Sequence, residues 1–134
     1  MIIGIGVDLV KIPRMQKMLK RWGDRFLNRV FTDSEITCAQ KKKLQHIFLS
    51  GRFAAKEAVL KALGIGLQMG VRWQEIETLH DDLGKPVITL SGKVQQIARD
   101  RMVSELFVSL SHEGDYAVAQ ALLTGKAGIS AAAI

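Results

Sequence analysis

The longest regular pattern in the chain lies between His46 and Leu63, where strong helix formers follow one another without a proline. Gly64 comes directly after this run, and glycine commonly ends helices. Small residues are frequent in the run, so one side of the helix is narrow enough to lie close against a sheet. We therefore expect a long central helix that packs in the core of the protein.

Shorter patterns flank this helix on both sides. Apolar residues and glycines in residues 1–10 are typical of a buried strand. Pro13 suits the first turn of a helix that runs to about Trp22, while Thr32 and Glu35 have the spacing of a capping box and predict the start of another helix. The remaining pattern predicts a loop at 64–70, strands at 73–79, 86–90, 106–110 and 116–122, and a helix at 91–102.

Length and composition favour one globular domain, because 134 residues with 48% hydrophobic content can bury a single modest core. We expect this domain to span residues 1–124 and a weakly patterned tail to follow at 125–134. No stretch approaches the roughly 20 apolar residues of a membrane span, and the apolar residues 1–6 are too few for a signal peptide. The expectation is a cytoplasmic protein without membrane contact, in which the lone Cys38 carries no chemistry.

The charge is unevenly distributed along the chain. Residues 1–61 hold 13 Lys and Arg against 5 Asp and Glu, whereas residues 62–134 hold 6 against 8. A one-sided positive surface attracts an anionic partner, which on charge alone could be nucleic acid, a membrane, an acidic protein or a phosphate-rich small molecule. The lysine run 41–43 also has a purely structural explanation, because cations stabilise the C-terminal end of the helix expected before it.

Two carboxylates stand out as candidates for chemistry. Asp8 lies near the end of the first strand, where an aspartate is disfavoured unless it caps the next helix or pairs with a positive group. Glu57 lies in the central helix four residues before Lys61, a spacing that an ordinary surface ion pair would also explain. Two carboxylates and a lysine are what is needed to hold Mg²⁺ against phosphate, because Mg²⁺ completes its shell with water and phosphate oxygens. Phosphoryl transfer is therefore the natural candidate reaction.

A polar segment separates the last two predicted strands. It contains Ser111 and His112, and polar residues on a loop held by rigid strands are a common way to build a site. An ordinary role for His112 in the turn remains an alternative.

Five motifs occur in order along nearly the whole chain: Gly4-Ile5-Gly6-Val7-Asp8-Leu9-Val10, Phe31-Thr32 with Glu35, Gly51-Arg52-Phe53-Ala54-Ala55-Lys56-Glu57-Ala58 with Lys61, Gly84-Lys85-Pro86, and Ser109-Leu110-Ser111-His112 with Tyr116-Ala117. With these motifs the chain resembles the holo-acyl-carrier-protein synthases of the phosphopantetheinyl transferase superfamily. The resemblance implies an α+β fold, in which a small antiparallel-rich sheet is packed by one long central helix and shorter helices. It also implies a homotrimer with sites shared across the interfaces, which suits a chain too small to bury coenzyme A alone.

The implied reaction is the transfer of 4'-phosphopantetheine from coenzyme A to a serine of apo acyl carrier protein, with release of adenosine 3',5'-bisphosphate, a step of fatty acid and lipid biosynthesis. By the resemblance, Asp8 and Glu57 ligate Mg²⁺, Glu57 activates the serine directly or through water, and Lys61 meets the phosphate of the leaving group. The residues that the resemblance assigns to coenzyme A are Arg52, Lys61, Gly64, Ser111 and His112. Those that it assigns to the acidic carrier protein are Arg14, Met18, Arg21 and Arg25. Lys11 departs from the family pattern, which often has an acidic residue there.

Two other classes of function compete with this interpretation. A metal-dependent nuclease also combines Asp, Glu and Lys, but typically with the Glu and Lys two residues apart on one strand, unlike Glu57 and Lys61. A nucleic-acid-binding module would fit a pI near 9.7, yet few aromatic residues are interleaved with the basic ones as a stacking platform requires. We therefore expect no nucleic-acid partner.

Overall fold

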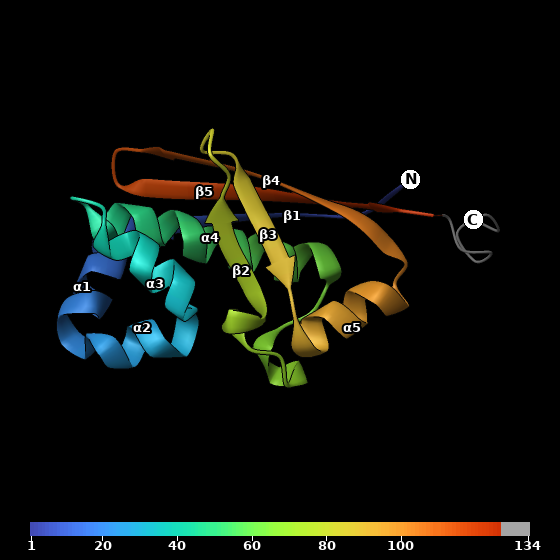
Figure 1. Ribbon diagram of the computed structural model, residues 1–134, viewed down its shortest axis with the longest axis horizontal. Coiled ribbons are helices and arrows are strands. Elements are labelled where there is room, and N and C mark those ends of the chain that lie inside the picture. The colour runs from blue at the N-terminus through green and yellow to red at the C-terminus, as the bar shows by residue number, and fades with distance from the viewer. Residues whose placement is uncertain (127–134) are drawn as a thin grey trace.

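The computed structural model describes residues 1–126, and the chain folds around one helix, α4 (Figure 1). The predicted α+β fold is confirmed. The elements are β1 (Ile2–Lys11), α1 (Ile12–Trp22), α2 (Asp24–Val30), α3 (Asp33–Gln40), α4 (Gln45–Leu63), the 3₁₀ turns η1 (Leu67–Met69) and η2 (Trp73–Glu75), β2 (Ile76–His80), β3 (Pro86–Leu90), α5 (Gly92–Asp100), β4 (Val103–Glu113) and β5 (Tyr116–Gly125).

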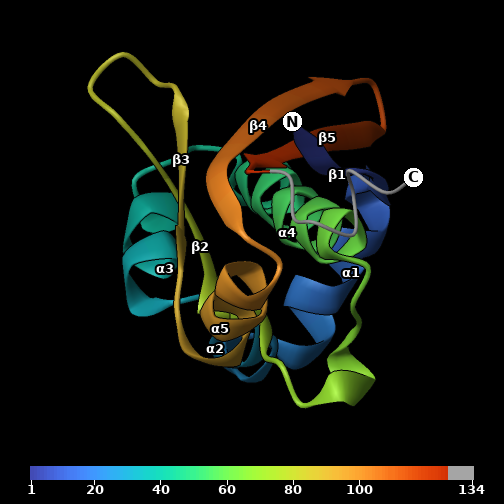
Figure 2. The same ribbon diagram turned by 90° about the vertical axis from the view of Figure 1, so that its right-hand side faces the viewer.

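Two antiparallel sheets flank α4. Strands β1, β5 and β4 form a three-stranded sheet in that order, while β2 and β3 form a separate hairpin. Figure 2 shows α4 against one face of the three-stranded sheet, with the hairpin and the other helices on the remaining sides of α4. A second cluster of buried side chains lies between α4 and the helices α1, α2 and α3, and it includes Met15, Val30, Phe31 and Leu49.

Helix α4 and strand β1 touch through small residues, as the composition of α4 predicted. Ala54, Ala58 and Ala62 are buried, and a Cβ atom added to Gly6 would lie 2.0 Å from the carbonyl oxygen of Ala58. A Cβ atom at Gly4 would come equally close, at 2.0 Å, to the carbonyl oxygen of Ala62. Glycine is therefore required at both strand positions, because any side chain there would push the strand away from the helix.

We expect Gly6→Ala to lower the free energy of unfolding by at least about 2 kcal/mol, because the new methyl group overlaps backbone rather than a movable side chain. Gly51→Ala is the matched control, since a Cβ atom at this helical position has no atom within 4 Å. That control should be stabilising by about 0.5–1 kcal/mol through helix propensity. Urea denaturation of both variants measures the difference, and equal stability of the two would show that the close contact is absent.

One predicted strand differs from the expectation in an important way. β1 is not buried on both faces: Ile5, Val7 and Leu9 are 57–62% exposed on the face turned away from α4. No helix or strand of residues 1–126 covers this outer face (Figure 2). Gly4 and Gly6 face the helix, and the apolar residues that alternate with them face the other way. The prediction of a strand buried on both faces is therefore wrong for this chain alone.

Smaller differences concern turns. Gly23, with φ of 52°, ends α1, and the short helix α2 that follows had not been predicted. Residues 73–75 form the turn η2 rather than the start of the predicted strand 73–79. β5 ends at Gly125, one residue into the expected tail, and the rest of that tail from residue 127 lies outside the described residues. The division at residue 124 therefore stays a prediction.

None of the helices formed by residues 1–126 is long and apolar enough to cross a membrane. The cytoplasmic location expected from the sequence stays a prediction.

Candidate active site

Asp8 and Lys61 meet where β1 crosses α4. The Lys61 Nζ atom donates hydrogen bonds to Asp8 Oδ1 at 2.9 Å and to the carbonyl oxygen of Val7 at 3.1 Å. The Asp8 side chain is 15% exposed, so its charge is largely withdrawn from water and is balanced by the lysine. Asp8 does not cap α1, because Lys11 occupies the N-cap position without a capping side chain.

Glu57 is bound by a residue that the sequence pattern did not connect to it. The indole N–H of Trp73 donates to Glu57 Oε1 at 2.7 Å. Lys61 pairs with Asp8 instead of Glu57, so the surface ion pair between positions 57 and 61 does not form. The carboxylate of Glu57 is thus held from the side of η2, while Lys61 reaches across to β1.

The register between β1 and α4 brings Asp8 to the level of Glu57. Gly4 faces Ala62 and Gly6 faces Ala58. A step of two residues forward along β1 therefore covers the same length as a step of about one turn back along α4, because the two elements run in opposite directions. The next position on the same face, Asp8, therefore lies beside the turn of α4 that contains Glu57. The two carboxylates predicted to act together come from elements that pack directly against each other.

Asp8 and Glu57 fit a magnesium ion better than a zinc ion. Within residues 1–126 no cluster of three or more His, Cys, Asp and Glu side chains could hold a metal by itself. Zinc sites use three or four protein ligands, whereas Mg²⁺ is usually held by one or two carboxylates together with water and substrate phosphate. The donor set and the neighbouring Lys61 suit a cation that is bound jointly with a phosphate group.

A buried ion pair lies one residue away from Glu57. The side chains of Lys56 and Glu35 are fully buried, and Lys56 Nζ lies 2.7 Å from Glu35 Oε1. Burial lowers the pKa of Lys56 from its usual value, and the charge of Glu35 with its hydrogen bond opposes this change. The lysine also donates to the carbonyl oxygens of Trp73 and Ile76, at 3.1 and 2.5 Å. The motif lysine next to Glu57 therefore ties α3, α4 and β2 together instead of facing the reaction site.

Glu35 completes this network. It accepts hydrogen bonds from the backbone N–H of Thr32 and of Thr78, at 2.8 and 2.9 Å, in addition to the one from Lys56. The predicted capping box of Thr32 and Glu35 is confirmed, since Thr32 Oγ1 in turn accepts from the Glu35 N–H at 3.2 Å. One carboxylate thus caps α3 and also neutralises the lysine of α4.

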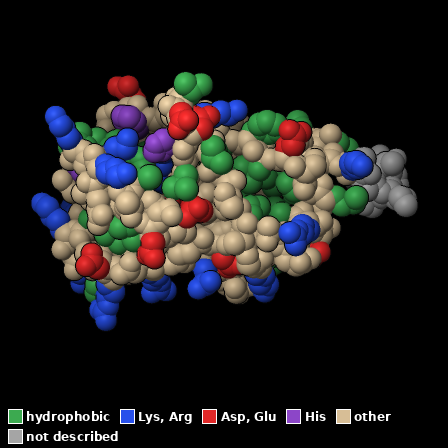
Figure 3. All heavy atoms as spheres, in the orientation of Figure 1, with side chains coloured by type: hydrophobic (Ala, Val, Ile, Leu, Met, Phe, Trp, Pro, Cys, Tyr) green, Lys and Arg blue, Asp and Glu red, His purple; other side chains and the backbone are tan. Residues whose placement is uncertain are grey.

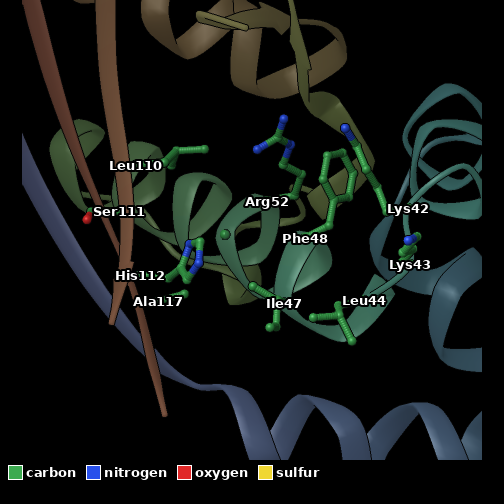
Figure 4. Close-up of a pocket in the computed structure, with 11 residues that line it drawn as sticks. Lys42, Lys43, Leu44, Ile47, Phe48, Arg52, Leu110, Ser111, His112 and Ala117 are labelled. Atoms are coloured by element: carbon green, nitrogen blue, oxygen red, sulfur yellow. The ribbon is translucent and has the colours of Figure 1, made fainter. Parts of the chain in front are cut away.

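A cavity of about 430 Å³ opens between the start of α4 and the strands β4 and β5, and Figure 4 shows the residues that line it. The Arg52 guanidinium lies 4.1 Å from the centre of the Phe48 ring, and Lys42 Nζ lies 5.4 Å from the same ring. Arg52 Nε is buried and has no hydrogen-bond partner among residues 1–126. Burial lowers the pKa of Arg52, and the charge of Glu35 partly opposes this change. A stacked arginine with an unused donor, flanked by Lys42 and Lys43, suits an anionic group beside a flat ring.

The structure places only some of the predicted coenzyme-binding residues at this cavity. Arg52, Ser111 and His112 line it, although the hydroxyl group of Ser111 points away from the cavity (Figure 4). Gly64 is absent from this lining: it caps the far end of α4 with φ of 70°, about 18 Å along the helix from Arg52. Lys42, Lys43 and Phe48 line the cavity although the sequence pattern had not assigned them to it, because the lysine run had an equally good explanation as a helix end.

The basic residues of α1 and α2 border a second hollow region. A cavity of about 470 Å³ is lined by Arg14 and Met18 together with Lys11, Phe53 and Trp73, among others. An adjoining one of about 410 Å³ is lined by Met18, Trp22, Arg25, Phe26 and Arg29. The Arg21 guanidinium lies 5.1 Å from the Trp22 ring. Figure 3 shows Lys and Arg side chains projecting from the end of the molecule that α1, α2 and α3 build. Apolar hollows with a basic border lie next to the carboxylate site, since Trp73 belongs to both.

Comparison with known proteins decides the family. The family model of the 4'-phosphopantetheinyl transferase superfamily matches residues 4–121. The chain belongs to this superfamily. The resemblance to its holo-acyl-carrier-protein synthases is confirmed, and so is the predicted class of enzyme, a transferase.

Individual relatives agree with this assignment over nearly their full length. The chain is 43% identical over 123 residues to the holo-acyl-carrier-protein synthase of Vibrio cholerae, which covers 92% of this chain and 98% of the relative. Its fold matches the crystal structure of the synthase from Neisseria meningitidis with a TM-score of 0.85 and 32% identity, over 92% of this chain and 99% of that one. The synthase from Bacillus anthracis, solved in complex with CoA (3',5'-ADP), matches with a TM-score of 0.76 and 37% identity, over 94% and 99% of the two chains.

Proposed function

We propose that this transferase moves 4'-phosphopantetheine from coenzyme A to a serine of apo acyl carrier protein and releases adenosine 3',5'-bisphosphate. The observation that carries the proposal is the meeting of Asp8 with Lys61 across the contact between β1 and α4, beside the held carboxylate of Glu57. Two carboxylates and an exposed lysine head group, carried by the packed elements β1 and α4, are suited to bind a pyrophosphate together with Mg²⁺.

The chemistry follows from the residues present. Asp8 and Glu57 would hold Mg²⁺, which when bound neutralises charge on the pyrophosphate. The serine Oγ forms a bond to the phosphorus that carries pantetheine, and the bond from this phosphorus to the bridging oxygen breaks. Glu57 takes the serine proton directly or through water, while Lys61 stabilises the negative charge on the departing adenosine 3',5'-bisphosphate.

Coenzyme A would place its adenosine phosphate in the cavity at the start of α4. Lys42, Lys43 and Arg52, whose Nε has no partner in the described part of the chain, supply cationic donors there, and the Phe48 ring supplies a flat apolar surface. Two related synthases, from Bacillus anthracis and Helicobacter pylori, were crystallised with CoA (3',5'-ADP) and with coenzyme A. Gly64 lies too far along α4 to share this cavity in one subunit, so its role would be at the other end of an extended coenzyme.

We infer that the chain assembles as a homotrimer through the outer face of its three-stranded sheet. Ile5, Val7 and Leu9 of β1 and Phe107 of β4 are all 45% or more exposed on that face. An apolar sheet face of this kind is typical of a surface that another chain covers. Ser111 points to the same side, away from its own cavity, so a second copy would bring this hydroxyl toward a neighbouring subunit (Figure 4).

Val7→Glu should convert the trimer to monomers, because a carboxylate at the centre of β1 cannot be buried without a partner. Light scattering after size-exclusion chromatography measures the mass directly. Thr89→Glu, at an exposed position on β3 away from this face, is the matched control and should remain trimeric. A wild-type chain that runs as a monomer at micromolar concentration would contradict the assembly.

The basic border of α1 would receive an acidic helix of the carrier protein. Arg14 and Met18 line one cavity and Arg25 lines the adjoining one, so cationic and apolar contacts alternate along this surface. Lys11 lies at the same border and is exposed, which favours a role in docking over one in metal binding.

Arg14→Ala should raise the apparent KM for carrier protein about tenfold and make its salt dependence shallower, with kcat little changed. Arg99→Ala, which removes an exposed cation of α5 far along the chain, is the matched control. Initial rates at several salt concentrations provide the measurement. An unchanged KM in Arg14→Ala would remove this residue from the docking surface.

The proposal is tested by product analysis. Chromatography of the nucleotides should show adenosine 3',5'-bisphosphate only when carrier protein, coenzyme A and Mg²⁺ are all present. With 3'-dephospho-coenzyme A, KM should rise if Lys42, Lys43 and Arg52 bind the 3'-phosphate. Release of nucleotide without a carrier protein would indicate hydrolysis rather than transfer.

A further inference from the structure

Trp73 is the described residue whose side chain hydrogen-bonds the carboxylate of Glu57. Its indole Nε1 donates to Glu57 Oε1 at 2.7 Å, a short distance for a hydrogen bond to a charged acceptor. We propose that Trp73 is a positioning residue: its N–H fixes the Glu57 carboxylate through Oε1, and so keeps Oε2 as the oxygen that meets the metal or the serine proton. This inference rests on the proposed function of Glu57 and adds a residue that acts only through it.

Trp73 can position another group because it is itself fixed from several sides. Its carbonyl oxygen accepts from the buried Lys56 Nζ at 3.1 Å, and its ring lies 5.8 Å from the Phe53 ring. The turn η2 that carries it is closed by Glu75, which is 5% exposed and accepts from the Arg72 N–H at 2.7 Å. Glu75 also accepts from the backbone N–H of Lys93, which joins the turn to α5.

Trp73 is bound to both of the neighbouring motif residues, Lys56 and Glu57. Lys56 anchors the backbone of Trp73, and the side chain of Trp73 returns to Glu57, the neighbour of Lys56. The chain of contacts closes a loop between α4 and η2. A buried ion pair therefore supports the orientation of a partly exposed catalytic carboxylate that it does not touch in the described network.

The physical benefit is a reduced set of rotamers for Glu57. A glutamate side chain has three rotatable bonds, and losing a fixed partner lets the carboxylate turn away from the geometry that proton transfer needs. A residue that acts in this way should affect kcat, because its N–H is already bound to Glu57 and is not a donor for the substrates. Phenylalanine keeps an aromatic ring at position 73 but removes the donor.

The contact can be tested in the protein alone by the indole N–H signals in a ¹H–¹⁵N spectrum. The chain has two tryptophans, Trp22 and Trp73, so Trp22→Phe leaves a single indole signal that reports on Trp73. We expect this signal downfield of that of Trp22 in the wild-type protein, and we expect it to move upfield when Glu57→Ala is added. Glu105→Ala, an exposed carboxylate of β4, is the matched control and should leave it in place. An indole signal unaffected by Glu57→Ala would overturn the proposed contact.

The effect on the reaction is tested with two changes at position 73. Trp73→Phe should lower kcat about tenfold, as should replacement of Trp73 by 3-benzothienylalanine, in which sulfur takes the place of the N–H and the ring shape is kept. The KM values for coenzyme A and carrier protein should stay the same in the sulfur isostere, because its apolar surface toward Met18 is preserved. The isostere also keeps the test valid if Trp73→Phe folds poorly.

The possible outcomes separate this inference from the proposed function. A normal kcat in the sulfur isostere would overturn the positioning role while leaving the transfer reaction intact. An inactive wild-type protein with the expected indole signals would instead contradict the proposed function and keep the contact. A rise in KM without a fall in kcat would show that the ring only lines the docking cavity, and would overturn the positioning role.

Discussion

Replacing Glu57 with alanine should lower kcat by a factor of about 100 or more while leaving the fold intact. The carboxylate would lose both its place beside the metal and its capacity to take the serine proton, and such groups act mainly in the transition state. Asp8→Ala should give a loss of similar size, because it removes the other carboxylate and releases Lys61 from its partner at 2.9 Å. Steady-state kinetics with saturating coenzyme A and carrier protein measure both losses.

The two variants should differ in their response to excess Mg²⁺. Excess Mg²⁺ should partly restore Asp8→Ala, which keeps the base, but should not restore Glu57→Ala. Thermal unfolding of both variants controls for loss of structure. Retention of more than about a tenth of wild-type kcat in a folded Glu57→Ala protein would remove Glu57 from the catalytic role.

Replacing Lys56 with methionine should strongly destabilise the protein, with a loss of about 3–5 kcal/mol in the free energy of unfolding. The side chain is fully buried, so its removal leaves the Glu35 carboxylate without its countercharge. The carbonyl oxygens of Trp73 and Ile76 also lose their donor. Chemical denaturation measures this change.

Lys17→Met is the matched control, since Lys17 is exposed on α1 and its loss should change stability by less than about 0.5 kcal/mol. Adding Glu35→Gln to Lys56→Met should recover part of the loss, because the neutral amide is cheaper to bury than an unpaired carboxylate. Equal stability of wild type and Lys56→Met would show that the pair is not buried in solution.

Local sequence pattern predicted the elements whose signals lie within one segment. The central helix was predicted because its helix formers and following glycine are consecutive, and the capping box because Thr32 and Glu35 are three residues apart. The hairpin of β2 and β3 and the helix α5 follow the same rule. Asp8 stands out in the sequence because a charge within an apolar strand conflicts with the local pattern, and its bond to Lys61 supplies the positive partner that burial requires.

Pattern alone could not reveal contacts between distant segments. Trp73 lies sixteen residues after Glu57, and an irregular loop separates the two. No helical or strand periodicity therefore predicts their contact. Glu35 had a sufficient local role as a cap, which concealed its bond to Lys56 twenty-one residues later. The exposed outer face of β1 was not predicted for the same reason. Apolar residues indicate a surface that is buried, but they do not indicate whether the same chain or another chain buries it. The reaction itself came from the family resemblance, since the residues alone indicated only magnesium-dependent phosphate chemistry.

The most direct test is intact-mass spectrometry of an apo acyl carrier protein incubated with this protein, coenzyme A and Mg²⁺. We predict a gain of about 340 Da, the mass of a phosphopantetheine arm, on the carrier protein. The gain should require Mg²⁺, disappear with Glu57→Ala, and be absent when the acceptor serine of the carrier is replaced by alanine. A folded protein that produces no gain on a carrier that other synthases modify would contradict the proposed transfer reaction.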